Sequence, residues 1–314
     1  MQRMTSTWLP GGGEGDLRAA MASALPGVTI GRLDTRRVQL DGPPEWAAAA
    51  AIDEAGQVIK YAWSEQAAAG IAREARLLQM LSGLIPVPEI VAVSDRPVLL
   101  VTRLVPGQPL DGRAPELATA EGRERVAVEL GTALARLHAP GVLARAGELV
   151  DLPPAAAQAT TRALRGRLAP WVAGRQWAQI LMWCDQVDET LTPRPLPDVL
   201  LHGDLHGHNQ IWSNGLGQLR AILDWATASR GEPEFDFRYL PDQAPEPDLL
   251  SLTAARYRQA GGRPLELRRI LAWHILTLLG DALWRSEAGV ALPDGRTPIE
   301  WVDDLERRLE VTGW

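Results

Sequence analysis

The stretch HGDLHGHN, residues 202–209, places three of the chain's five histidines within seven residues, with Asp204 among them. Such crowding allows two interpretations. The histidines and the aspartate could form a metal cage. Alternatively, the stretch could be a catalytic loop in which Asp204 and Asn209 carry the chemistry. The two interpretations require different residues elsewhere in the chain.

The metal-cage interpretation needs further ligands downstream. GDLHG is similar to one sequence block of the metal-dependent phosphoesterases, whose later blocks supply carboxylate, Asn and His ligands. After Asn209 the only histidine is His274, inside the apolar run ILAWHILTLLG, and no GNH block follows. A lone histidine in such a run is expected to pack in the core. A phosphoesterase therefore stays a distant alternative.

The catalytic-loop interpretation finds its partners in order along the chain. In phosphoryl transfer by kinases, an aspartate takes the hydroxyl proton and an asparagine five residues later holds a metal ion. Asp204 and Asn209 have this spacing. A second aspartate holds the metal from beyond a hairpin. Asp224 occupies that place, because it follows the predicted hairpin formed by NQIWS and LRAIL.

The same chemistry uses a lysine on an N-terminal strand and a helix glutamate that steadies it. WAAAAAIDEAGQVIKYAW, residues 46–63, is predicted to form a hairpin with the turn DEAG, which puts Lys60 in the second strand. Ser64 is the expected N-cap of a helix over residues 65–81, and this helix carries Glu74. Each residue alone is a weak signal, whereas the ordered set is a strong one.

The remaining pattern predicts a strand-rich first part and a helical second part. A short helix is expected over residues 16–24, and two strands are expected within 84–110. From residue 121 the spacing of apolar residues is mostly helical, and it returns to helical from about residue 248. A short linker is expected near 105–115. The exception in the helical part is the hairpin after the crowded histidines.

These residues resemble the aminoglycoside phosphotransferase family, a branch of the protein-kinase-like fold that includes the antibiotic kinases. LHGDLHGHNQIW is similar to the family's catalytic loop, and AILDWATASRGEPEFDFRYL is similar to its metal-binding segment. The resemblance covers roughly residues 25–310. It implies an α+β, two-lobed fold, with a β-rich N-lobe over residues 1–104 and a helical C-lobe over residues 105–314 that holds the catalytic loop and the acceptor site.

The resemblance also implies roles for the central residues. Asp204 would be the catalytic base, or the group that orients the acceptor hydroxyl. Asn209 and Asp224 would bind Mg²⁺. Lys60 would contact the α- and β-phosphates of ATP or GTP, with Glu74 as its ion-pair partner.

Further roles concern the hinge and the support of the loop. Arg103, Leu104 and Val105 would form the hinge whose backbone reads the nucleobase. His202 would support the catalytic loop from below, and Asp236 would hydrogen-bond the loop's backbone.

Two departures from the family pattern stand out. The loop over the phosphates usually carries Gly and Ser, whereas VQLDGPPEW has Gly42 followed by Pro43 and Pro44. Prolines donate no backbone N–H, so a partial or acceptor-assisted phosphate cradle is expected. Glu232 stands where the family usually has Asp, and it is expected to keep a capping role.

The function implied is transfer of the γ-phosphate of ATP or GTP to a hydroxyl of a small molecule, with an antibiotic as the expected acceptor. The acceptor could be aminoglycoside-like, otherwise cationic, or macrocyclic. Two alternatives stay open. The chain could be a kinase of a metabolic alcohol or sugar, or a non-catalytic nucleotide-binding pseudokinase. The intact set of Lys60, Asp204, Asn209 and Asp224 argues against the pseudokinase, because a binding module has no use for a base.

Acceptor specificity is expected from side chains late in the chain. Asp281 follows the apolar run ILTLLG, where a carboxylate needs a partner. It is expected to face the cleft and to pair with an amine of a cationic acceptor, near Trp284. The full set of expected acceptor residues is His208, Asp242, Asp281, Trp284 and Glu287.

Composition excludes several classes of protein. The 314-residue chain has a net charge of −7 and a pI near 5.4, which argues against a nucleic-acid partner. No stretch approaches the roughly 18 apolar residues of a membrane span. The first residues, MQRMTSTWLPGGGEG, lack the apolar core of a secretory signal, so a cytoplasmic location is expected. The single cysteine, Cys184, is expected to be buried and inert. The oligomeric state and the acceptor's identity are left open by the sequence.

Overall fold

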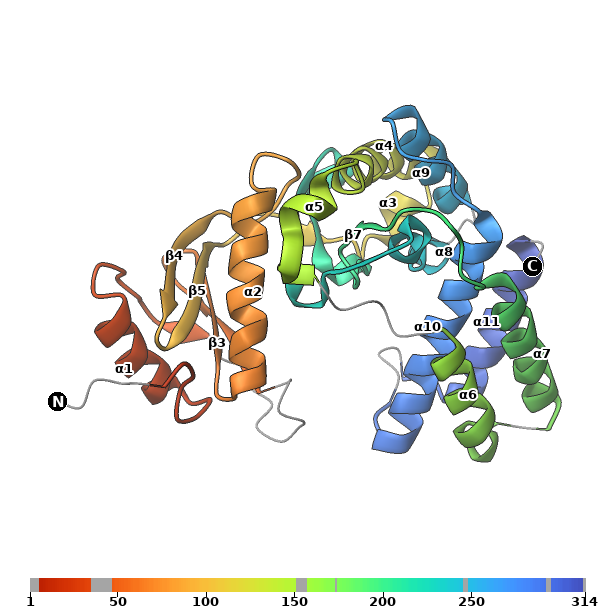
Figure 1. Ribbon diagram of the computed structural model, residues 1–314, viewed down its shortest axis with the longest axis horizontal. Coiled ribbons are helices and arrows are strands. Elements are labelled where there is room, and N and C mark those ends of the chain that lie inside the picture. Colours follow the sequence, from red (N-terminus) through yellow and green to blue (C-terminus); the bar gives the residue numbers. More distant parts are fainter. Residues whose placement is uncertain are drawn as a thin grey trace.

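The computed structural model describes residues 6–34, 47–150, 157–172, 174–244, 248–291 and 295–312. It has the expected α+β, two-lobed fold, with a small antiparallel sheet on one side and a helical lobe on the other (Figure 1). We call the part formed by the elements up to β5 the N-lobe and the part from β6 onward the C-lobe. The N-lobe elements are α1 Glu14–Ala24, β1 Leu33–Asp34, β2 Ala48–Asp53, β3 Gln57–Ala62, α2 Glu65–Leu81, β4 Ile90–Asp95 and β5 Val98–Arg103.

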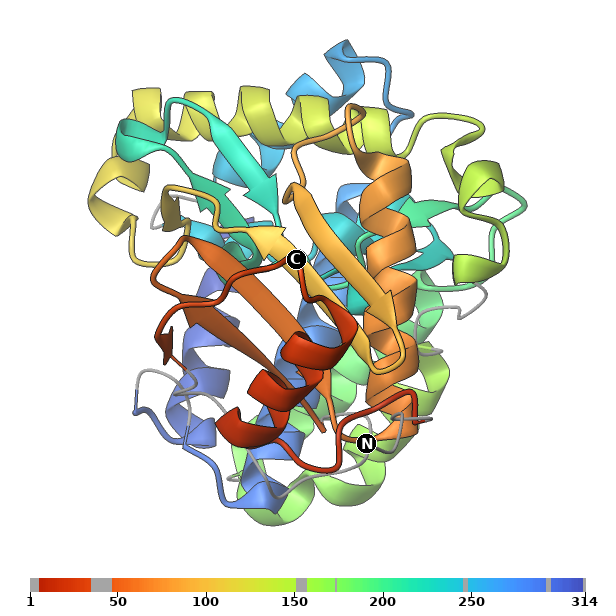
Figure 2. The ribbon, with the colours of Figure 1, turned by 90° about the vertical axis from the view of Figure 1, so that its left-hand side faces the viewer.

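The N-lobe sheet has the strand order β1-β2-β3-β5-β4, and its neighbouring strands are antiparallel. Alternation along β3 decides which way Lys60 points, because successive strand residues face opposite sides of a sheet. Ile59 and Tyr61 pack in a core with Leu17 and Met21 of α1. Lys60 therefore faces the other side, where α2 packs. Figure 2 shows α1 in front of the sheet and α2 beside it.

Helix α2 forms for local reasons and is held by its apolar face. The Ser64 hydroxyl accepts a hydrogen bond from the Ala67 amide at 3.2 Å, which confirms the predicted N-cap. Ile71, Ala75 and Leu78 are buried, as their helical spacing predicts, in the core cluster that also contains Leu100 of β5. Glu74 lies on the same buried side with only 3% of its surface exposed, so this carboxylate requires a partner.

The C-lobe is mostly helical, as predicted from residue 121 onward. Its helices are α3 Ala114–Leu117, α4 Ala120–Leu137, α5 Val142–Ala146, α6 Ala157–Arg167, α7 Gly174–Thr190, α8 Leu240–Gln243, α9 Asp248–Gln259, α10 Leu267–Ala288 and α11 Pro298–Thr312. Short 3₁₀ helices are η2 Gly147–Val150, η3 Ala169–Trp171, η4 Gly207–Asn209, η5 Asn214–Leu216, η6 Trp225–Thr227 and η7 Pro233–Phe237. The strands are β6 Gln108–Pro109, β7 Val199–Leu201, β8 Gln210–Trp212, β9 Leu219–Ile222 and β10 Ser229–Gly231.

The predicted C-lobe hairpin is confirmed as β8 and β9, but it is part of a larger arrangement. β6 pairs with β8, and β7 pairs with β10 in a separate two-stranded sheet. Sequence patterns missed β6, β7 and β10 because strands of two or three residues are too short to show alternation. These small sheets position the predicted catalytic loop, residues 202–209, since this loop connects β7 to β8.

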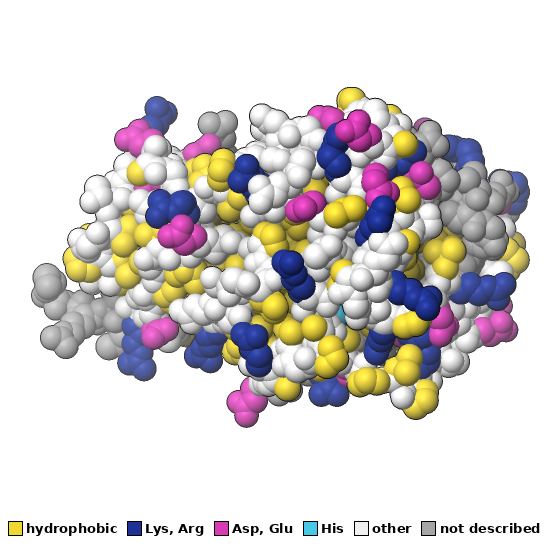
Figure 3. All heavy atoms as spheres, turned by 90° about the horizontal axis from the view of Figure 1, so that it is seen from above, with side chains coloured by type: hydrophobic (Ala, Val, Ile, Leu, Met, Phe, Trp, Pro, Cys, Tyr) yellow, Lys and Arg dark blue, Asp and Glu magenta, His cyan; other side chains and the backbone are white. Residues whose placement is uncertain are grey.

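Other expectations concern burial and the surface. Cys184 is buried as predicted, and burial raises the pKa of its thiol to about 11, which keeps it neutral. His274 is also buried. Within the part of the chain that the structure describes, no helix is long and apolar enough to cross a membrane. On the face shown in Figure 3, basic side chains are interspersed with Asp and Glu and with hydrophobic side chains.

Candidate active site

The catalytic loop begins where β7 ends, and a buried carboxylate holds its backbone. Asp236 of η7 accepts hydrogen bonds from the backbone amides of His202 and Gly203, both at 2.9 Å. Nε2 of His138, a buried residue, lies 3.1 Å from the same carboxylate. Gly203 has a φ of +87°, and a Cβ there would lie 2.3 Å from the Thr227 carbonyl oxygen, so only glycine fits this turn. The structure thus places Asp236 against the loop backbone.

His202 links the loop to the segment that carries Asp224. Its Nε2 lies 2.8 Å from the carbonyl oxygen of Leu223, and its Nδ1 accepts from the amide of Asp204 at 3.2 Å. The ring is fully buried and packs edge-on against the Trp225 ring. Burial lowers the pKa of His202, which suits a neutral ring with one donor and one acceptor nitrogen.

The Asp204 carboxylate is about one third exposed and is held by neighbouring side chains. Its Oδ1 accepts from the Tyr239 hydroxyl at 2.7 Å, and its Oδ2 lies 3.4 Å from Nε2 of His206. Burial alone would raise the pKa of Asp204. His206, then Tyr239 and the Arg238 guanidinium, outweigh burial and lower this pKa to about 2. The carboxylate is therefore ionised at neutral pH.

The β8–β9 hairpin brings Asn209 next to Asp224. The Leu223 amide donates to the Asn209 carbonyl at 2.8 Å, extending the pairing by one step beyond Gln210 and Ile222. The Asn209 side-chain nitrogen donates to the Asp204 carbonyl at 2.8 Å, which leaves its side-chain oxygen for a cation. Asp224 has a φ of +60°, and its side chain is half exposed. The two oxygen-bearing groups suit Mg²⁺, a hard cation.

Lys60 reaches across to both lobes. Its ammonium donates to Glu74 at 2.7 and 2.9 Å and to Asp224 at 3.2 Å. Glu74 also accepts from the Trp225 amide at 3.4 Å, so one buried carboxylate joins the sheet, α2 and the C-lobe. Burial would lower the pKa of Lys60, but Glu74 and Asp224 outweigh it and raise this pKa. Lys60 is the only lysine among the 32 lysine and arginine residues of the chain.

Two adjoining cavities meet at Lys60, Glu74 and Asp224. The larger, about 580 Å³, lies between β2, the start of α2 and the segment after Asp224. Here Arg73 donates to the carbonyl of Ala226 at 2.6 Å. The smaller, about 120 Å³, is lined mainly by apolar side chains and by Arg103, Leu104 and Val105. Its mainly apolar lining suits a ring system beside the larger cavity.

The three predicted hinge residues differ in whether their backbone N–H and C=O groups are already hydrogen-bonded within the protein. The Arg103 amide donates to Glu89, and the Leu104 amide donates to Gly56 at 2.9 Å. Among the described residues, nothing bonds to the N–H or C=O of Val105. Of the three predicted hinge residues, Val105 therefore has both backbone groups free for a ligand.

The predicted acceptor residues are scattered, and most already have partners. His208 is exposed and lies 3.2 Å from Asp111, a residue that the sequence did not suggest. Asp242 lies 3.6 Å from His274. Asp281, 37% exposed, binds Arg285 one helical turn on at 2.7 Å, so its carboxylate does not depend on a ligand amine. Glu287 pairs with Arg167, and Trp284 is exposed. Contact of these residues with an acceptor stays a prediction.

The structure changes the interpretation of Glu232. Glu232 precedes η7, but its side chain makes no capping hydrogen bond, so the predicted capping role is wrong. The longer side chain instead reaches Arg269 at 2.6 Å, Arg194 at 3.2 Å and the Trp273 indole. The predicted phosphate loop, with Gly42, Pro43 and Pro44, lies outside the described residues.

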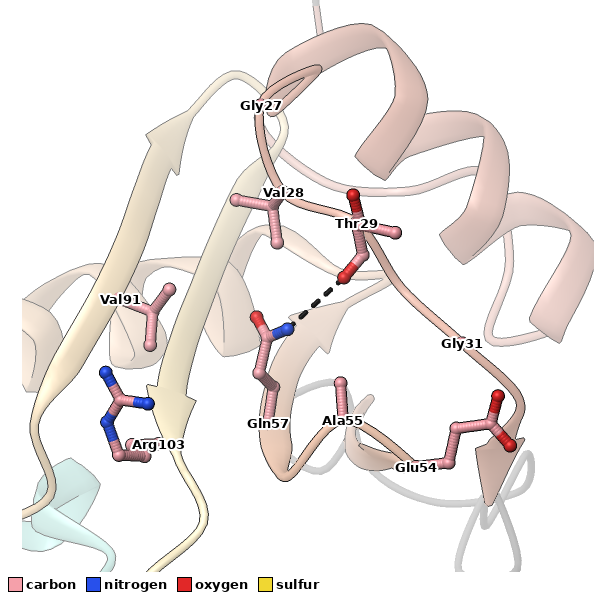
Figure 4. Close-up of a pocket in the computed structure, with 9 residues that line it drawn as sticks. All are labelled: Gly27, Val28, Thr29, Gly31, Glu54, Ala55, Gln57, Val91 and Arg103. Atoms are coloured by element: carbon pink, nitrogen blue, oxygen red, sulfur yellow. Dashed lines mark hydrogen bonds between the residues drawn. The ribbon is translucent and has the colours of Figure 1, made fainter.

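A separate hollow of about 530 Å³ lies on the N-lobe, away from Lys60 (Figure 4). It is bordered by residues 27–31, the β2–β3 turn and Arg103. The Gln57 side chain donates to the Thr29 carbonyl at 3.2 Å, as the figure shows, and ties the two segments together. Arg103 is bound to Glu89 at 2.9 Å. Of the residues that line this hollow, only Arg103 also lines the smaller of the two cavities at Lys60.

In the part of the chain that the structure describes, no group of three or more His, Cys, Asp and Glu side chains could hold a metal ion by itself. The crowded histidines are therefore not seen as a metal cage. His202 supports the loop, His206 contacts Asp204, and His208 faces outward.

The structure has a small antiparallel sheet over a helical lobe. A lysine–glutamate pair lies beside an Asp-x-x-x-x-Asn loop and a further aspartate. Together these features define a protein-kinase-like phosphotransferase. The model of the phosphotransferase enzyme family (APH) matches residues 27–274. The chain belongs to this family.

Three solved structures that share this fold are distant from the chain in sequence. The GDP complex of aminoglycoside 2'-phosphotransferase-IIIa is 18% identical, with a TM-score of 0.71, over 96% of this chain and 98% of that one. Macrolide 2'-phosphotransferase MphH from Brachybacterium faecium is 24% identical, with a TM-score of 0.59, over 88% and 93%. ADP-bound aminoglycoside phosphotransferase APH(2'')-Ib is 15% identical, with a TM-score of 0.60, over 95% and 97%. At these identities the likeness establishes the fold alone. No curated protein matches the sequence.

Proposed function

We propose that this phosphotransferase moves the γ-phosphate of ATP or GTP to a hydroxyl group of an antibiotic. The observation that carries the proposal is the contact of Lys60 with Asp224 between the lobes, beside the loop in which Asn209 is hydrogen-bonded to Asp204. Lys60 and Asp224 are in direct contact. Asp204 and Asn209 are held in place by the loop and by the β8–β9 hairpin. Phosphoryl transfer depends mainly on such positioning and on charge neutralisation.

In the proposed reaction, the acceptor hydroxyl lies against the Asp204 carboxylate. A carboxylate with a pKa near 2 is a weak base, so it orients the hydroxyl and takes its proton late, as the new O–P bond forms. This order suits a loose transition state, in which the bond to the leaving phosphate oxygen is largely broken first.

The charges of the nucleotide would be met from both lobes. Asn209 and Asp224 would hold Mg²⁺, which when bound neutralises charge on the β- and γ-phosphates. Lys60, fixed by Glu74, would contact the α- and β-phosphates in the larger cavity. The nucleobase would occupy the smaller cavity, with its edge at the free N–H and C=O of Val105.

Support for an antibiotic acceptor comes from the proteins that share this fold. The solved structures include aminoglycoside phosphotransferases in complex with kanamycin and with gentamicin, and macrolide 2'-phosphotransferases. We propose resistance by phosphorylation as the biological outcome. We place the enzyme in the cytoplasm, where nucleoside triphosphates are supplied. Residues 1–104 would then bind the nucleotide, and residues 105–314 would supply the catalytic loop and the acceptor site.

A coupled assay of nucleotide consumption tests this proposal. ATP and GTP would each be offered with kanamycin, gentamicin, a macrolide, choline and a simple sugar, and each product would be checked for added phosphate. We expect turnover with one antibiotic class. Preference for choline or the sugar would favour the metabolic kinase. Nucleotide binding without turnover of any acceptor would favour the pseudokinase.

Replacing Asp224 with asparagine tests the metal site. Asp224→Asn exchanges a charged oxygen ligand for a neutral one around a hard cation, so Mg²⁺-dependent nucleotide binding should weaken about tenfold or more. Calorimetric titration with and without Mg²⁺ measures the effect, and Asp95→Asn on the exposed end of β4 is the matched control. If neither Mg²⁺ nor Asp224→Asn changes nucleotide affinity, the assignment is wrong.

Replacing Lys60 tests the phosphate contact. Lys60→Ala removes the phosphate-binding cation and leaves the buried Glu74 with one partner fewer, so kcat/KM for the nucleotide should fall about tenfold or more. Lys60→Arg keeps the charge but replaces a compact ammonium with a planar fork, and it should not restore the wild-type value. Steady-state kinetics with varied nucleotide measures both variants. Unchanged nucleotide kinetics in Lys60→Ala would exclude the contact.

A further inference from the structure

Tyr239 is the residue that contacts the Asp204 carboxylate most closely. It follows η7 in the chain, three residues after Asp236. Its hydroxyl donates to Asp204 Oδ1 at 2.7 Å and accepts from Arg238 Nη2 at 3.1 Å. Because the Arg238 N–H points at the phenol oxygen, the single phenol hydrogen is directed toward Asp204. The Tyr239 ring also packs edge-on against the His206 ring.

Arg238 gives this arrangement a fixed base. It is buried, and its guanidinium donates to the Thr277 hydroxyl at 3.0 Å, to the Phe235 carbonyl at 2.9 Å and to the Gly203 carbonyl at 2.7 Å. The guanidinium also lies over the Tyr239 ring at 4.3 Å. A side chain with so many fixed contacts cannot follow a moving partner, so the Tyr239 hydroxyl is anchored to α10 and to the catalytic loop.

The two carboxylate oxygens of Asp204 therefore have different surroundings. Oδ1 is occupied by Tyr239, with Arg238 at 3.9 Å. Oδ2 faces His206 at 3.4 Å, which is longer than a normal hydrogen bond to a charged group. The side chain keeps about one third of its surface exposed. Oδ2, whose contact with His206 is the longer of the two, is thus the oxygen more open to the acceptor hydroxyl.

We propose that Tyr239, fixed by Arg238, is a positioning residue that holds Asp204 Oδ1 and so presents Oδ2 to the acceptor hydroxyl. The inference rests on the proposed function. In the transfer step the acceptor O–H bond breaks and its proton goes to Oδ2, while the acceptor oxygen forms a bond to the γ-phosphorus. The bond from that phosphorus to the β-phosphate oxygen breaks, and the nucleoside diphosphate leaves with the electron pair. Tyr239 keeps its proton throughout.

Tyr239→Phe tests this role because it removes one oxygen and keeps the ring between Arg238 and His206. Loss of a hydrogen bond to a charged group should lower kcat about ten- to a hundredfold, with KM for the nucleotide unchanged within about twofold. Tyr61→Phe is the matched control, since Tyr61 donates one buried hydrogen bond to the Gly12 carbonyl at 3.0 Å in the N-lobe. The control should keep kcat within about twofold. Consumption of ATP and GTP is followed with water as the acceptor and with the antibiotic that the panel identifies.

A double-mutant cycle separates positioning from general support. Because Tyr239 acts through the Asp204 carboxylate, Tyr239→Phe should lower turnover no further in an Asp204→Ala protein. Tyr239→Leu, which removes the hydroxyl and also the ring that contacts Arg238 and His206, should lose at least as much kcat as Tyr239→Phe. A kcat for Tyr239→Phe equal to that of Tyr61→Phe, or an equal loss with and without Asp204, would overturn the inference. Wild-type turnover in Asp204→Ala itself would instead refute the proposed function.

Discussion

Asp204→Ala should lower kcat about 10²–10⁴-fold while nucleotide affinity and the fold stay intact. The structure explains why the loss should be confined to turnover. Asp204 contributes to the loop through its backbone, since its carbonyl accepts from Asn209 and its amide donates to His202, and alanine keeps both groups. Among the described residues, the carboxylate itself contacts side chains alone, namely those of Tyr239, His206 and Arg238.

Steady-state kinetics and calorimetric nucleotide titration on the same preparation measure the two halves of this prediction. Asp204→Asn is the matched control for shape, because it retains an oxygen that can accept from Tyr239 but cannot take a proton at neutral pH. Both variants should be inactive to a similar degree. Turnover within a few-fold of wild type in a folded Asp204→Ala protein would refute the mechanism.

Asp236→Ala should lower the free energy of unfolding by about 3–5 kcal/mol, the range for removing one partner of a buried charged network. The carboxylate is buried, and its removal leaves the amides of His202 and Gly203 and the ring of His138 without their acceptor. Denaturant unfolding measures the change. Asp95→Ala on the surface is the control and should stay within about 0.5 kcal/mol. If Asp236→Ala also lowers the free energy of unfolding by no more than about 0.5 kcal/mol, the prediction is wrong. Water would then replace the carboxylate as the acceptor.

The contribution of Asp236 should also depend on pH in one direction. Burial would raise its pKa, but the hydrogen bonds from His138 and from the Gly203 amide outweigh burial and lower it. A carboxyl whose pKa is lower in the folded state stabilises the fold above its unfolded value, about 3.9. The stabilisation is lost as the pH falls below that value. The gap between wild type and Asp236→Ala should therefore be full at neutral pH and narrow below about pH 4.

The sequence predicted those parts of the fold that follow from local pattern. The hairpin that carries Lys60, the Ser64 cap and the spacing of α2 are short-range features, and the structure has all three. The lysine–glutamate pair was predicted because two weak signals stood at a spacing that the phosphotransfer chemistry requires. The contact at 2.7 Å confirms that they meet.

Other parts depend on contacts between distant segments, which one sequence does not reveal. Tyr239 lies 35 residues from Asp204, and nothing in the pattern FDFRYL shows that its hydroxyl turns toward the loop. The contact between Asp111 and His208 also joins segments that are distant in the sequence, so the sequence did not reveal it. Asp281 was expected to need a ligand amine, but an arginine one helical turn away supplies the charge. A search of the sequence for i, i+4 partners would have found that pair.

The lone lysine makes the enzyme unusually easy to observe. Apart from any terminal amine, Lys60 is the only alkyl amine in the chain, and it sits where the two lobes meet. Reductive methylation with ¹³C-formaldehyde would therefore give one side-chain NMR signal, free of overlap and without mutagenesis. Its chemical shift would report the distance to Asp224, and thus the opening and closing of the cleft. By the same logic, coupling of the protein to a surface through the Lys60 amine would block the proposed nucleotide site.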